Sequence, residues 1–424
     1  MKRRFYHARI LTMEPGRPVL EGEVWVEQER ITYVGETKES EVPIRWDEEI
    51  DCRGNLLMPG FKNAHTHSGM TLLRSYADDL PLQAWLNDRV FPIEAGMTEE
   101  DIYHLTRLAV LEYLTSGITS IFDMYLTPES IARACSEMGM RCVQTGGVNN
   151  FSQSVELMEK WCNELNGGDP LISFLPGFHA EYTCSRELLE QIAAFSGNKK
   201  LPVYVHVSET EAEVKGCLER YGMTPGKFLD SLGMFEYGGG VYHGVWLTRE
   251  EMDIFREKKV SVITNPASNM KLASGIAPVS QFLKAGLNVA IGTDGPASNN
   301  CLDMFREMFL VTGLAKLATG DASAVDALEV LKMATVNGAA AMRLPEADVL
   351  AEGKLADMIM IDLHLPNMQP LNHIAKNVVY SGSKQNVKMT MIHGQILYRD
   401  GRFLTEADPE AIYEKANEII NRLK

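Results

Sequence analysis

The sequence has 424 residues, of which 45% are hydrophobic and 23% are charged, so it has room for one large core and a smaller one. A formal net charge of -16, without a Lys/Arg cluster, argues against nucleic-acid binding. No apolar run reaches the ~20 residues of a membrane span, and the start "MKRRFYHARILTMEPG" lacks the apolar core of a signal peptide.

The cysteine pattern points to a reducing compartment. Seven cysteines are scattered along the chain, and none forms a C-x-x-C pair. An odd number of scattered cysteines in a long chain is typical of reduced thiols in a cytosolic protein. The sequence therefore predicts a cytoplasmic protein without a disulfide framework.

The two ends of the chain have a strand-rich pattern that differs from the middle. Residues 1–56 contain short β-like runs with turn signals, and the pattern returns after 348. We therefore expect one small β-sandwich built from 1–56 and 349–424, with a closing helix in the second part. Residues 57–348 then form an inserted domain.

Within the middle segment, short apolar runs alternate with longer helical patterns, as in a parallel sheet buried on both faces. The eight runs are 56–67, 117–125, 141–148, 171–180, 202–209, 240–246, 260–269 and 288–295. Helix starts are indicated where Thr98 is followed by Asp101 and Thr248 by Glu251, as in a capping box. This alternation predicts an α/β fold with a (β/α)8 barrel. A doubly wound open sheet is the main alternative, but no glycine-rich dinucleotide motif follows the first run.

Histidines and an aspartate occur near the ends of several predicted strands. His65 and His67 lie in "NAHTH", and residues two apart on a strand share one face. His206 and His243 lie on the fifth and sixth runs, and Asp294 ends the eighth. A barrel gathers its strand ends at one mouth. Taken singly, each residue could be an ordinary polar group, but three histidines and a carboxylate together suit Zn²⁺, or alternatively Fe²⁺.

Glu209 follows His206 by three residues and is expected to face the same mouth. A bound divalent metal lowers the pKa of water, and a glutamate that is not a ligand can then carry protons in a hydrolytic deamination. The simpler alternative is a first-turn residue stabilised by the helix dipole. Both interpretations can hold together.

The chain resembles the amidohydrolase superfamily and, within it, the methylthioadenosine/S-adenosylhomocysteine deaminase group. The resemblance covers nearly the whole chain. It is carried by "MPGFKNAHTHSGMTLLRSYADDLPLQAWL", "FPIEAG", "HVSETEAE", "NPASNMKLASGIAPV" and "GTDGPASNNCLDMFREM". The metal ligands that it implies are His65, His67, His206 and Asp294. Asp294 would also act as a base, Glu209 would protonate the ring nitrogen, and His243 would polarise the attacking water.

The resemblance also implies a substrate-binding set. Trp85 and Glu94 match positions on the loop after the first strand, where Glu94 would accept hydrogen bonds from two ribose hydroxyls. His179, in "GFHAEY", matches a substrate-contacting histidine. Two-metal members of the superfamily have a carboxylated lysine at that strand end. Here the nearest lysines, Lys199 and Lys200, are predicted in a polar loop, so one metal is expected.

The sequence departs from the resemblance near the third and fourth strands. Relatives that accept S-adenosylhomocysteine have an arginine where this chain has Gly146 and Gly147, and Arg141 comes too early to replace it. Loss of that carboxylate partner would cost ~2–4 kcal/mol. A 5'-group without a carboxylate is therefore favoured. Glu181 is expected to face solvent, and Trp246 is expected to serve mainly in packing.

These observations predict a deaminase that converts an adenine nucleoside to the inosine analogue and ammonia. The candidates are 5'-methylthioadenosine, 5'-deoxyadenosine, adenosine and, less favoured, S-adenosylhomocysteine. The alternative is an aminohydrolase or chlorohydrolase for guanine, a pterin or a triazine, and a more remote alternative is a non-catalytic structural relative. The expected partner is a small purine nucleoside, not a nucleic acid or a membrane. A homo-oligomer is possible, but no sequence pattern decides it.

Overall fold

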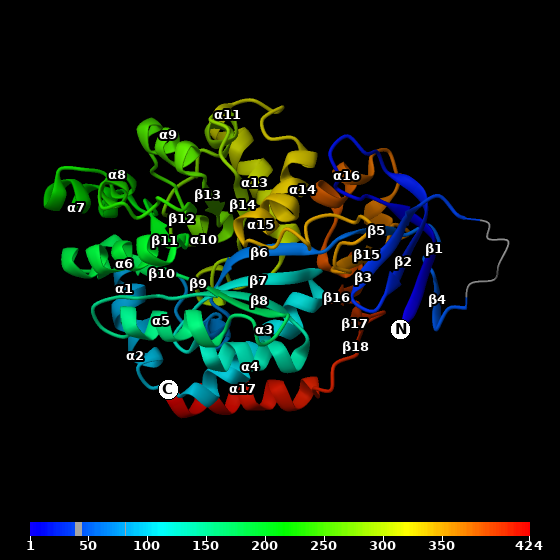
Figure 1. Cartoon of the computed structure of the whole chain (residues 1–424), viewed down its shortest axis with the longest axis horizontal. Helices are drawn as coiled ribbons and strands as arrows, with labels where there is room; N and C mark the ends of the chain where they lie inside the picture. Colours follow the sequence, from blue (N-terminus) through cyan, green and yellow to red (C-terminus); the bar gives the residue numbers. More distant parts are fainter. Residues whose placement is uncertain (39–44, 81) are drawn as a thin grey trace.

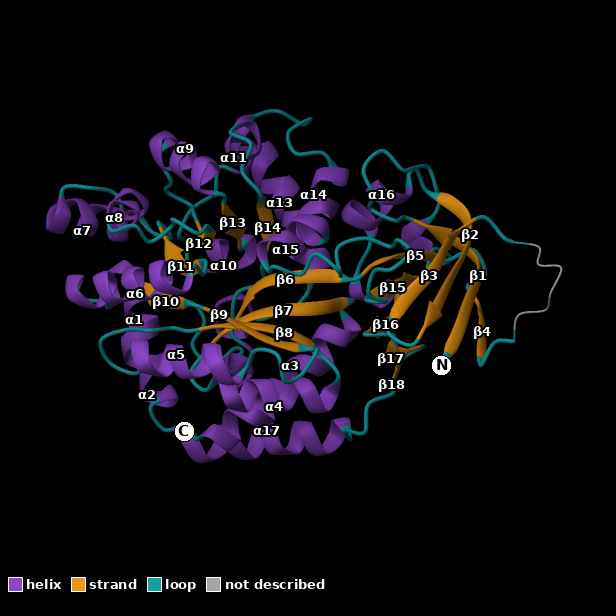
Figure 2. Cartoon of the chain, in the orientation of Figure 1, coloured by secondary structure: helices purple, strands orange, loops and turns teal. Residues whose placement is uncertain are grey.

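The chain is described from a computed structural model that covers residues 1–38, 45–80 and 82–424. Figure 1 shows a body in which strands β6 to β14 are surrounded by helices, and a separate sheet at one end that holds the N-terminus. Figure 2 shows the same division, with most helices around the body and long strands in the end sheet. This is the predicted fold class of a barrel with a β-unit from both termini.

One nine-stranded sheet contains strands from both ends of the chain, in the order β18-β17-β16-β15-β5-β1-β2-β3, with β4 also paired to β1. The strands are β1 (Lys2–Ile10), β2 (Leu20–Glu27), β3 (Arg30–Gly35), β4 (Glu48–Asp51), β5 (Leu56–Pro59), β15 (Met358–Ile361), β16 (Val387–Ile392), β17 (Gln395–Arg399) and β18 (Arg402–Phe403). A Cβ on Gly394, after β16, would lie 1.9 Å from the carbonyl oxygen of Gln28, after β2. One buried cluster contains Phe5 and Val24 together with Met358 and Met391, so the two halves of the sheet share one core, as in a sandwich.

Two parallel sheets, β6-β7-β8-β9 and β10-β11-β12-β13-β14, form the barrel wall. Their strands are β6 (Phe61–Thr66), β7 (Ile118–Met124), β8 (Arg141–Thr145), β9 (Ile172–Leu175), β10 (Gly177–Ala180), β11 (Val203–Val207), β12 (Gly239–His243), β13 (Val260–Thr264) and β14 (Val289–Ile291). Val148 and Phe178 form a bridge across one junction. At the other, the Asp294 N–H donates to the His65 carbonyl oxygen over 3.0 Å.

Two of the predicted strand runs are divided in the structure. The run 171–180 is broken at Pro176 into β9 and β10, because proline has no N–H for the ladder. The run 56–67 is shared between the two parts of the molecule: β5 pairs with β15 in the end sheet, and β6 begins the barrel. One continuous stretch of chain, from β5 into β6, therefore belongs to both the end sheet and the barrel.

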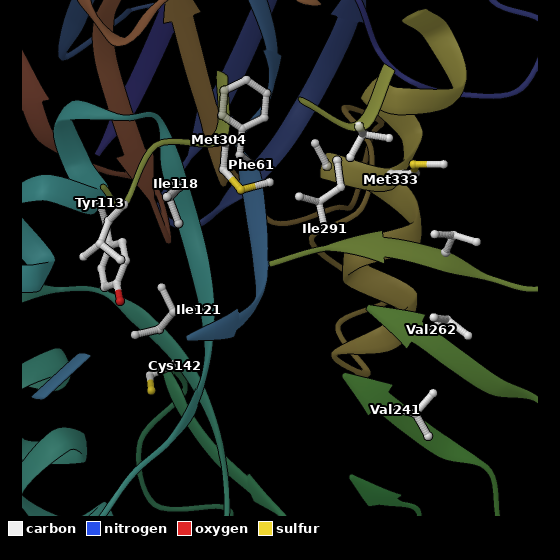
Figure 3. Packing of buried hydrophobic residues seen from close by; sticks show 14 of the residues in the cluster. Phe61, Tyr113, Ile118, Ile121, Cys142, Val241, Val262, Ile291, Met304 and Met333 are labelled. Carbon is white, nitrogen blue, oxygen red and sulfur yellow. The ribbon is translucent and has the colours of Figure 1, made fainter. Parts of the chain in front are cut away.

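Alternate residues of each barrel strand face in opposite directions, so the strands contribute to two buried layers, one between the strands and the helices and one inside the barrel. The larger buried cluster lies between the strands and the helices. In Figure 3 it includes Ile121, Val241 and Ile291 from the strands and Met304 and Met333 from the helices. A second buried cluster contains the intervening residues Ala64, Phe122, Tyr204, Tyr242, Ile263 and Ala290. Aromatic rings thus fill the interior of the barrel, which is a packed core and not a pore.

The helices cover the outside of the barrel, with short ones in the loops (Figure 1). They are α1 (Leu82–Trp85), α2 (Phe91–Glu94), α3 (Glu99–Thr115), α4 (Pro128–Met138), α5 (Val155–Glu164), α6 (Arg186–Lys199), α7 (Glu211–Tyr221), α8 (Pro225–Ser231), α9 (Arg249–Lys258), α10 (Pro266–Lys271), α11 (Val279–Lys284), α12 (Pro296–Asn299), α13 (Met304–Thr319), α14 (Ala327–Ala334), α15 (Val336–Ala341), α16 (Ile374–Lys376) and α17 (Pro409–Leu423). The predicted capping boxes at Thr98 and Thr248 are both present. Within the described ranges, no helix combines the length and apolarity needed to cross a membrane.

Helix α17 is the predicted closing helix, and it lies along the barrel rather than on the end sheet (Figure 1). Ala416 and Ile419 belong to the same buried cluster as Trp85 and Ile93, which lie in the segment after β6. The Arg422 guanidinium donates to the carboxylate of Asp101 at the start of α3. The C-terminal helix therefore supports the loop that follows the first barrel strand.

Candidate metal and substrate site

Strands β6, β11, β12 and β14 bring the five predicted rim residues together. His65 lies in β6 and His67 directly follows it; His206 lies in β11, His243 ends β12, and Asp294 comes just after β14. His243 and Asp294 have φ angles of 69° and 59°. Left-handed backbone is uncommon at non-glycine residues.

The side chains of these residues converge within a few ångströms. The distance from Asp294 Oδ1 is 3.1 Å to His67 Nε2 and 3.5 Å to His65 Nε2. His206 Nε2 lies 3.1 Å from His65 Nε2. Within the described ranges, His65, His67 and Asp294 form one group with ligand atoms no more than 4.8 Å apart, and His65, His206 and His243 form a second. The two groups share His65.

Hydrogen bonds on the outer ring nitrogens orient the imidazoles toward this point. The Nδ1–H of His206 donates to the carbonyl oxygen of His179 over 2.7 Å, and that of His67 donates to the carbonyl oxygen of Met124. A neutral imidazole protonated on Nδ1 has its lone pair on Nε2. His206 Nε2 therefore points a lone pair at the Nε2 atom of His65, an arrangement that a cation would satisfy. The residues present fit a divalent metal.

The electrostatics of the cluster agree with that fit. Burial lowers the pKa of His65 to about 3, which keeps the ring neutral, as a ligand must be. Burial also acts to lower the pKa of His67, but the hydrogen bond with Asp294 raises it to about 9. Burial acts to raise the pKa of Asp294, yet hydrogen bonds from the two histidines hold it well below its usual range. A cation would take the place of the proton between His67 and Asp294.

Glu209 and His243 lie beside the cluster. His243 Nε2 is 3.8 Å from Glu209 Oε2 and 3.9 Å from Asp294 Oδ2. The Nδ1–H of His243 donates to Asn269 Oδ1 over 2.8 Å, so Nε2 faces the two acids. Burial raises the pKa of Glu209, which favours the protonated acid. An acid that can donate a proton therefore stands next to the cluster of histidines and Asp294.

Several supporting residues were not singled out from the sequence. Ser268 Oγ donates to Asp294 Oδ2, and Ser274 Oγ donates to Glu209 Oε1 over 3.4 Å. Asn269 belongs to the same segment, which follows β13. The available signal was the position of this polar segment at the end of a predicted barrel strand. Its individual contacts depend on the turn geometry and could not be assigned from residue types alone.

Glu94 and Trp85 lie on the segment after β6, as expected, but in different surroundings. The Tyr125 hydroxyl donates to Glu94 Oε1 over 2.7 Å, and the Tyr125 ring centroid lies 6.4 Å from that of His67. Burial raises the pKa of Glu94 to about 7. Trp85 is 5% exposed and packs among the apolar residues of the loop. Tyr125 thus connects Glu94 to the histidine cluster, whereas Trp85 contributes to the loop's own core.

His179 lies at the same rim, at the end of the broken fourth strand. Its ring centroid is 5.1 Å from that of His206, and its Nδ1 lies 3.2 Å from Thr183 Oγ1. Burial lowers the pKa of His179 to about 4. Lys199, by contrast, ends helix α6 rather than lying in a loop, and its ammonium pairs with Glu159 at 3.0 Å. A neutral histidine therefore occupies the rim at this strand end.

The region beyond β8 has no side chain at Gly146 or Gly147. Arg141 starts that strand at the opposite end of the barrel. Its guanidinium forms two hydrogen bonds of 2.6 and 3.1 Å with the buried carboxylate of Asp357. Arg141 therefore joins the barrel to the end sheet and does not serve the rim, in agreement with its early position in the strand.

Two minor expectations differ from the structure. Glu181 was expected to face solvent, but it is 1% exposed and pairs with the Arg220 guanidinium at 2.6 and 3.2 Å. A buried carboxylate needs such a partner, and α7 supplies it. Trp246 was expected mainly to pack, but it is 42% exposed, and its indole N–H donates to the Ser274 carbonyl oxygen over 2.8 Å.

Comparison with known proteins assigns this architecture to a family. The sequence model described as "Amidohydrolase family" matches residues 56–397. The match spans most of the chain, including strands of both the barrel and the end sheet. The chain belongs to the amidohydrolase family.

Named relatives and a solved structure cover almost the whole chain. The 5-methylthioadenosine/S-adenosylhomocysteine deaminase of Desulforamulus reducens is 38% identical over 98% of each chain. The 5'-deoxyadenosine deaminase of Methanothermobacter thermautotrophicus is 42% identical over 90% of each chain. An adenosine deaminase structure from Xanthomonas campestris with bound zinc has a TM-score of 0.94 and 33% identity, covering 99% of this chain and 98% of that one. The resemblance expected from the motifs is confirmed.

Proposed function

We propose that the protein is a metal-dependent hydrolase that deaminates an adenine nucleoside to the corresponding inosine analogue and ammonia. The observation that carries the proposal is the convergence of His65, His67, His206 and Asp294 beside the buried acid Glu209. The relatives named as deaminases of 5'-methylthioadenosine, S-adenosylhomocysteine and 5'-deoxyadenosine support the same substrate class.

The four converging residues are the proposed metal ligands, and they would hold one divalent ion, with Zn²⁺ favoured over Fe²⁺. Imidazole nitrogen and carboxylate oxygen are ordinary zinc donors, and the related Xanthomonas structure contains zinc. When bound, such an ion supplies Lewis acidity and lowers the pKa of a nearby water. Asp294, besides its ligand role, is ionised because its pKa is held well below its usual range, and a carboxylate ion has lone pairs with which to accept a proton from that water.

The protein's own side chains account for the proton transfers. As water oxygen bonds to C6 of the purine, Asp294 accepts one water proton and Glu209 donates its proton to N1. The proton on Asp294 then passes to the exocyclic amine, which leaves as ammonia when the C6–N bond breaks. The remaining hydroxyl proton returns to Glu209, so both acids regain their starting states. His243 would orient the water through Nε2, since its Nδ1–H is held by Asn269.

Glu94 is proposed to bind the ribose. One of its oxygens accepts from Tyr125, and a carboxylate has further lone pairs for the two ribose hydroxyls. This contact favours nucleosides over the free bases and ring systems of the alternative hypothesis, namely guanine, pterins and triazines. His179 and Trp85 are proposed as further substrate contacts or supports at the same rim.

The 5'-group is proposed to lack a carboxylate, as in 5'-methylthioadenosine, 5'-deoxyadenosine and adenosine. Gly146 and Gly147 provide no guanidinium beyond β8, and Arg141 is committed to Asp357. An unpaired substrate carboxylate would lose ~2–4 kcal/mol of binding. We therefore expect S-adenosylhomocysteine to be a weaker substrate than the other three nucleosides.

The test is the loss of adenine ultraviolet absorbance after addition of zinc-loaded protein. Five compounds are compared under the same conditions: 5'-methylthioadenosine, 5'-deoxyadenosine, adenosine, S-adenosylhomocysteine and free adenine. Rapid conversion of the first three supports the proposal, and weak conversion of S-adenosylhomocysteine supports the argument from Gly146. Failure on all five, with metal bound, would exclude adenine nucleosides and direct the search to the other ring systems.

A further inference from the structure

The turn that carries Glu209 is held by a second buried glutamate. Strand β11 ends at Val207, and Ser208 then adopts a φ of 53° before the chain reaches Glu209. The backbone N–H groups of Ser208 and Glu209 donate to the two carboxylate oxygens of Glu213, over 2.7 and 2.8 Å. Glu213 lies in the first turn of α7 and is 7% exposed. One side chain therefore satisfies two consecutive backbone donors in a left-handed turn.

The other side of the turn is also fixed. The carbonyl oxygen of Ser208 accepts a hydrogen bond from the backbone N–H of Trp246 over 2.9 Å, and Trp246 follows β12. The Ser208 peptide groups are thus held between α7 and the loop after β12. With these bonds in place, the Glu209 backbone has little freedom, and its side chain is directed toward His243.

Helix α9 shows what the same sequence pattern does elsewhere in this protein. Both α7 and α9 begin with Thr-x-x-Glu, with Thr210 or Thr248 as the N-cap and Glu213 or Glu251 three residues later. Glu251 closes a capping box by accepting from the Thr248 N–H over 2.8 Å, and it also accepts from the Gly226 N–H over 2.8 Å. A capping box usually contributes to helix stability.

Glu213 forms a different set of contacts from the same helix position. Its hydrogen bonds extend past the N-cap residue to the amides of Ser208 and Glu209, and α7 has no capping box. Both glutamates are buried and both bind two backbone amides, but only Glu213 binds the amide of the proposed catalytic acid. The difference between the two helices lies in what their glutamates hold.

We propose that Glu213 is a positioning residue for the deamination, acting through Glu209. The inference rests on the proposed function of Glu209 as the proton carrier. Glu213 does not touch substrate in this proposal; it fixes the backbone from which Glu209 reaches the ring nitrogen. Small displacements of a reacting group can cost on the order of 10²-fold in rate.

The first test compares Glu213→Gln with Glu251→Gln in the full-length, zinc-loaded protein. Glutamine keeps the size of the side chain, but its NH₂ group cannot accept from an amide N–H. We expect both variants to lower Tm. We expect only Glu213→Gln to reduce kcat, by about 10- to 100-fold, with KM within threefold and metal content unchanged. A second variant, Glu213→Asp, keeps the carboxyl group but shortens its reach, and we expect the same separation of kcat from KM.

The second test is a double-mutant cycle with Glu209→Gln. If Glu213 acts through Glu209, adding Glu213→Gln to Glu209→Gln leaves the residual kcat unchanged, because the group being positioned is already inactive. A further fall in the double variant would show a general structural role and overturn the inference, as would wild-type kcat in Glu213→Gln. Lack of wild-type activity on every adenine nucleoside would instead refute the proposed function itself.

Discussion

The histidine cluster and the loop after β6 form two sides of one rim but are built differently. The cluster lies on or next to the ends of parallel strands, and its residues are held by neighbouring backbone, as in the bond from His206 Nδ1 to the His179 carbonyl. The loop consists of short helices that pack on one another and on α17. Under the proposed function, the strand ends carry the reaction chemistry, whereas the loop, which has its own packing against α17, carries the contacts that select the substrate.

The largest effect is expected from removing a proposed metal ligand of the histidine cluster. His65→Ala should reduce bound zinc from one equivalent to near zero and lower kcat by at least ~10⁴-fold, because both the ion and its water activation are lost. Metal analysis and initial rates measure this. His7→Ala is the matched control, since His7 is an exposed histidine in the end sheet. Full activity in metal-free His65→Ala protein would contradict the ligand assignment.

A smaller loss of kcat is expected from Glu209→Gln, which changes the acid beside the histidine cluster. Zinc content should remain at the wild-type level, while kcat falls by ~10²–10⁴-fold, the usual contribution of a positioned acid or base. KM should change little, because the amide keeps the shape of the carboxyl group. Turnover near the wild-type rate would remove Glu209 from the proton transfers.

The proposed ribose contact of the loop after β6 is tested by Glu94→Ala. We expect KM for 5'-deoxyadenosine to rise ~10- to 100-fold, since a charge-assisted contact with the ribose is lost. The same change should affect reaction of free adenine by less than threefold, if that slow reaction is measurable. Glu99→Ala serves as the control, because Glu99 is an exposed residue at the start of α3. Equal losses with both compounds would end the ribose assignment.

The smallest expected effect is a change with pH in the preference for the nucleoside over adenine, caused by the titration of Glu94 in the loop. Burial raises the pKa of Glu94 to about 7 in the free protein, so the carboxyl becomes protonated as pH falls through 7 and loses acceptor capacity. The ratio of kcat/KM for 5'-deoxyadenosine to that for adenine should therefore fall by up to about tenfold per pH unit on the acid side. Taking the ratio cancels the titration of the shared cluster. Glu94→Gln should show no such change in the ratio.

Much of this arrangement could be anticipated from residues alone. The period of the apolar runs predicted the barrel, and the positions of His65, His206 and Asp294 near strand ends predicted their convergence, because parallel strands end on one side. The capping signals at Thr98 and Thr248 were also confirmed.

Other features depend on distances that a sequence does not contain. The burial of Glu181 requires Arg220 from α7, and no local pattern shows that the two side chains meet. Pro176 interrupts the fourth strand, but because the residues on both sides of it are mainly apolar, the sequence suggested one continuous strand. The two Thr-x-x-Glu patterns were indistinguishable as sequence, since the redirected contacts of Glu213 follow from the left-handed turn at Ser208.

The continuity of β5 and β6 has a consequence for how the chain folds. β5 pairs with β15, which is formed by residues far along the sequence, while β6 carries the first of the site histidines. Pairings between distant segments cost more loop-closure entropy than local pairings, and they slow folding. During synthesis, the apolar strand Leu56–Pro59 has to wait for β15 before one of its edges is covered. We therefore expect β5, which leads into the strand that carries His65, to pair first with β1 and later with β15, so that the edge of β5 that faces β15 stays unpaired until β15 is made.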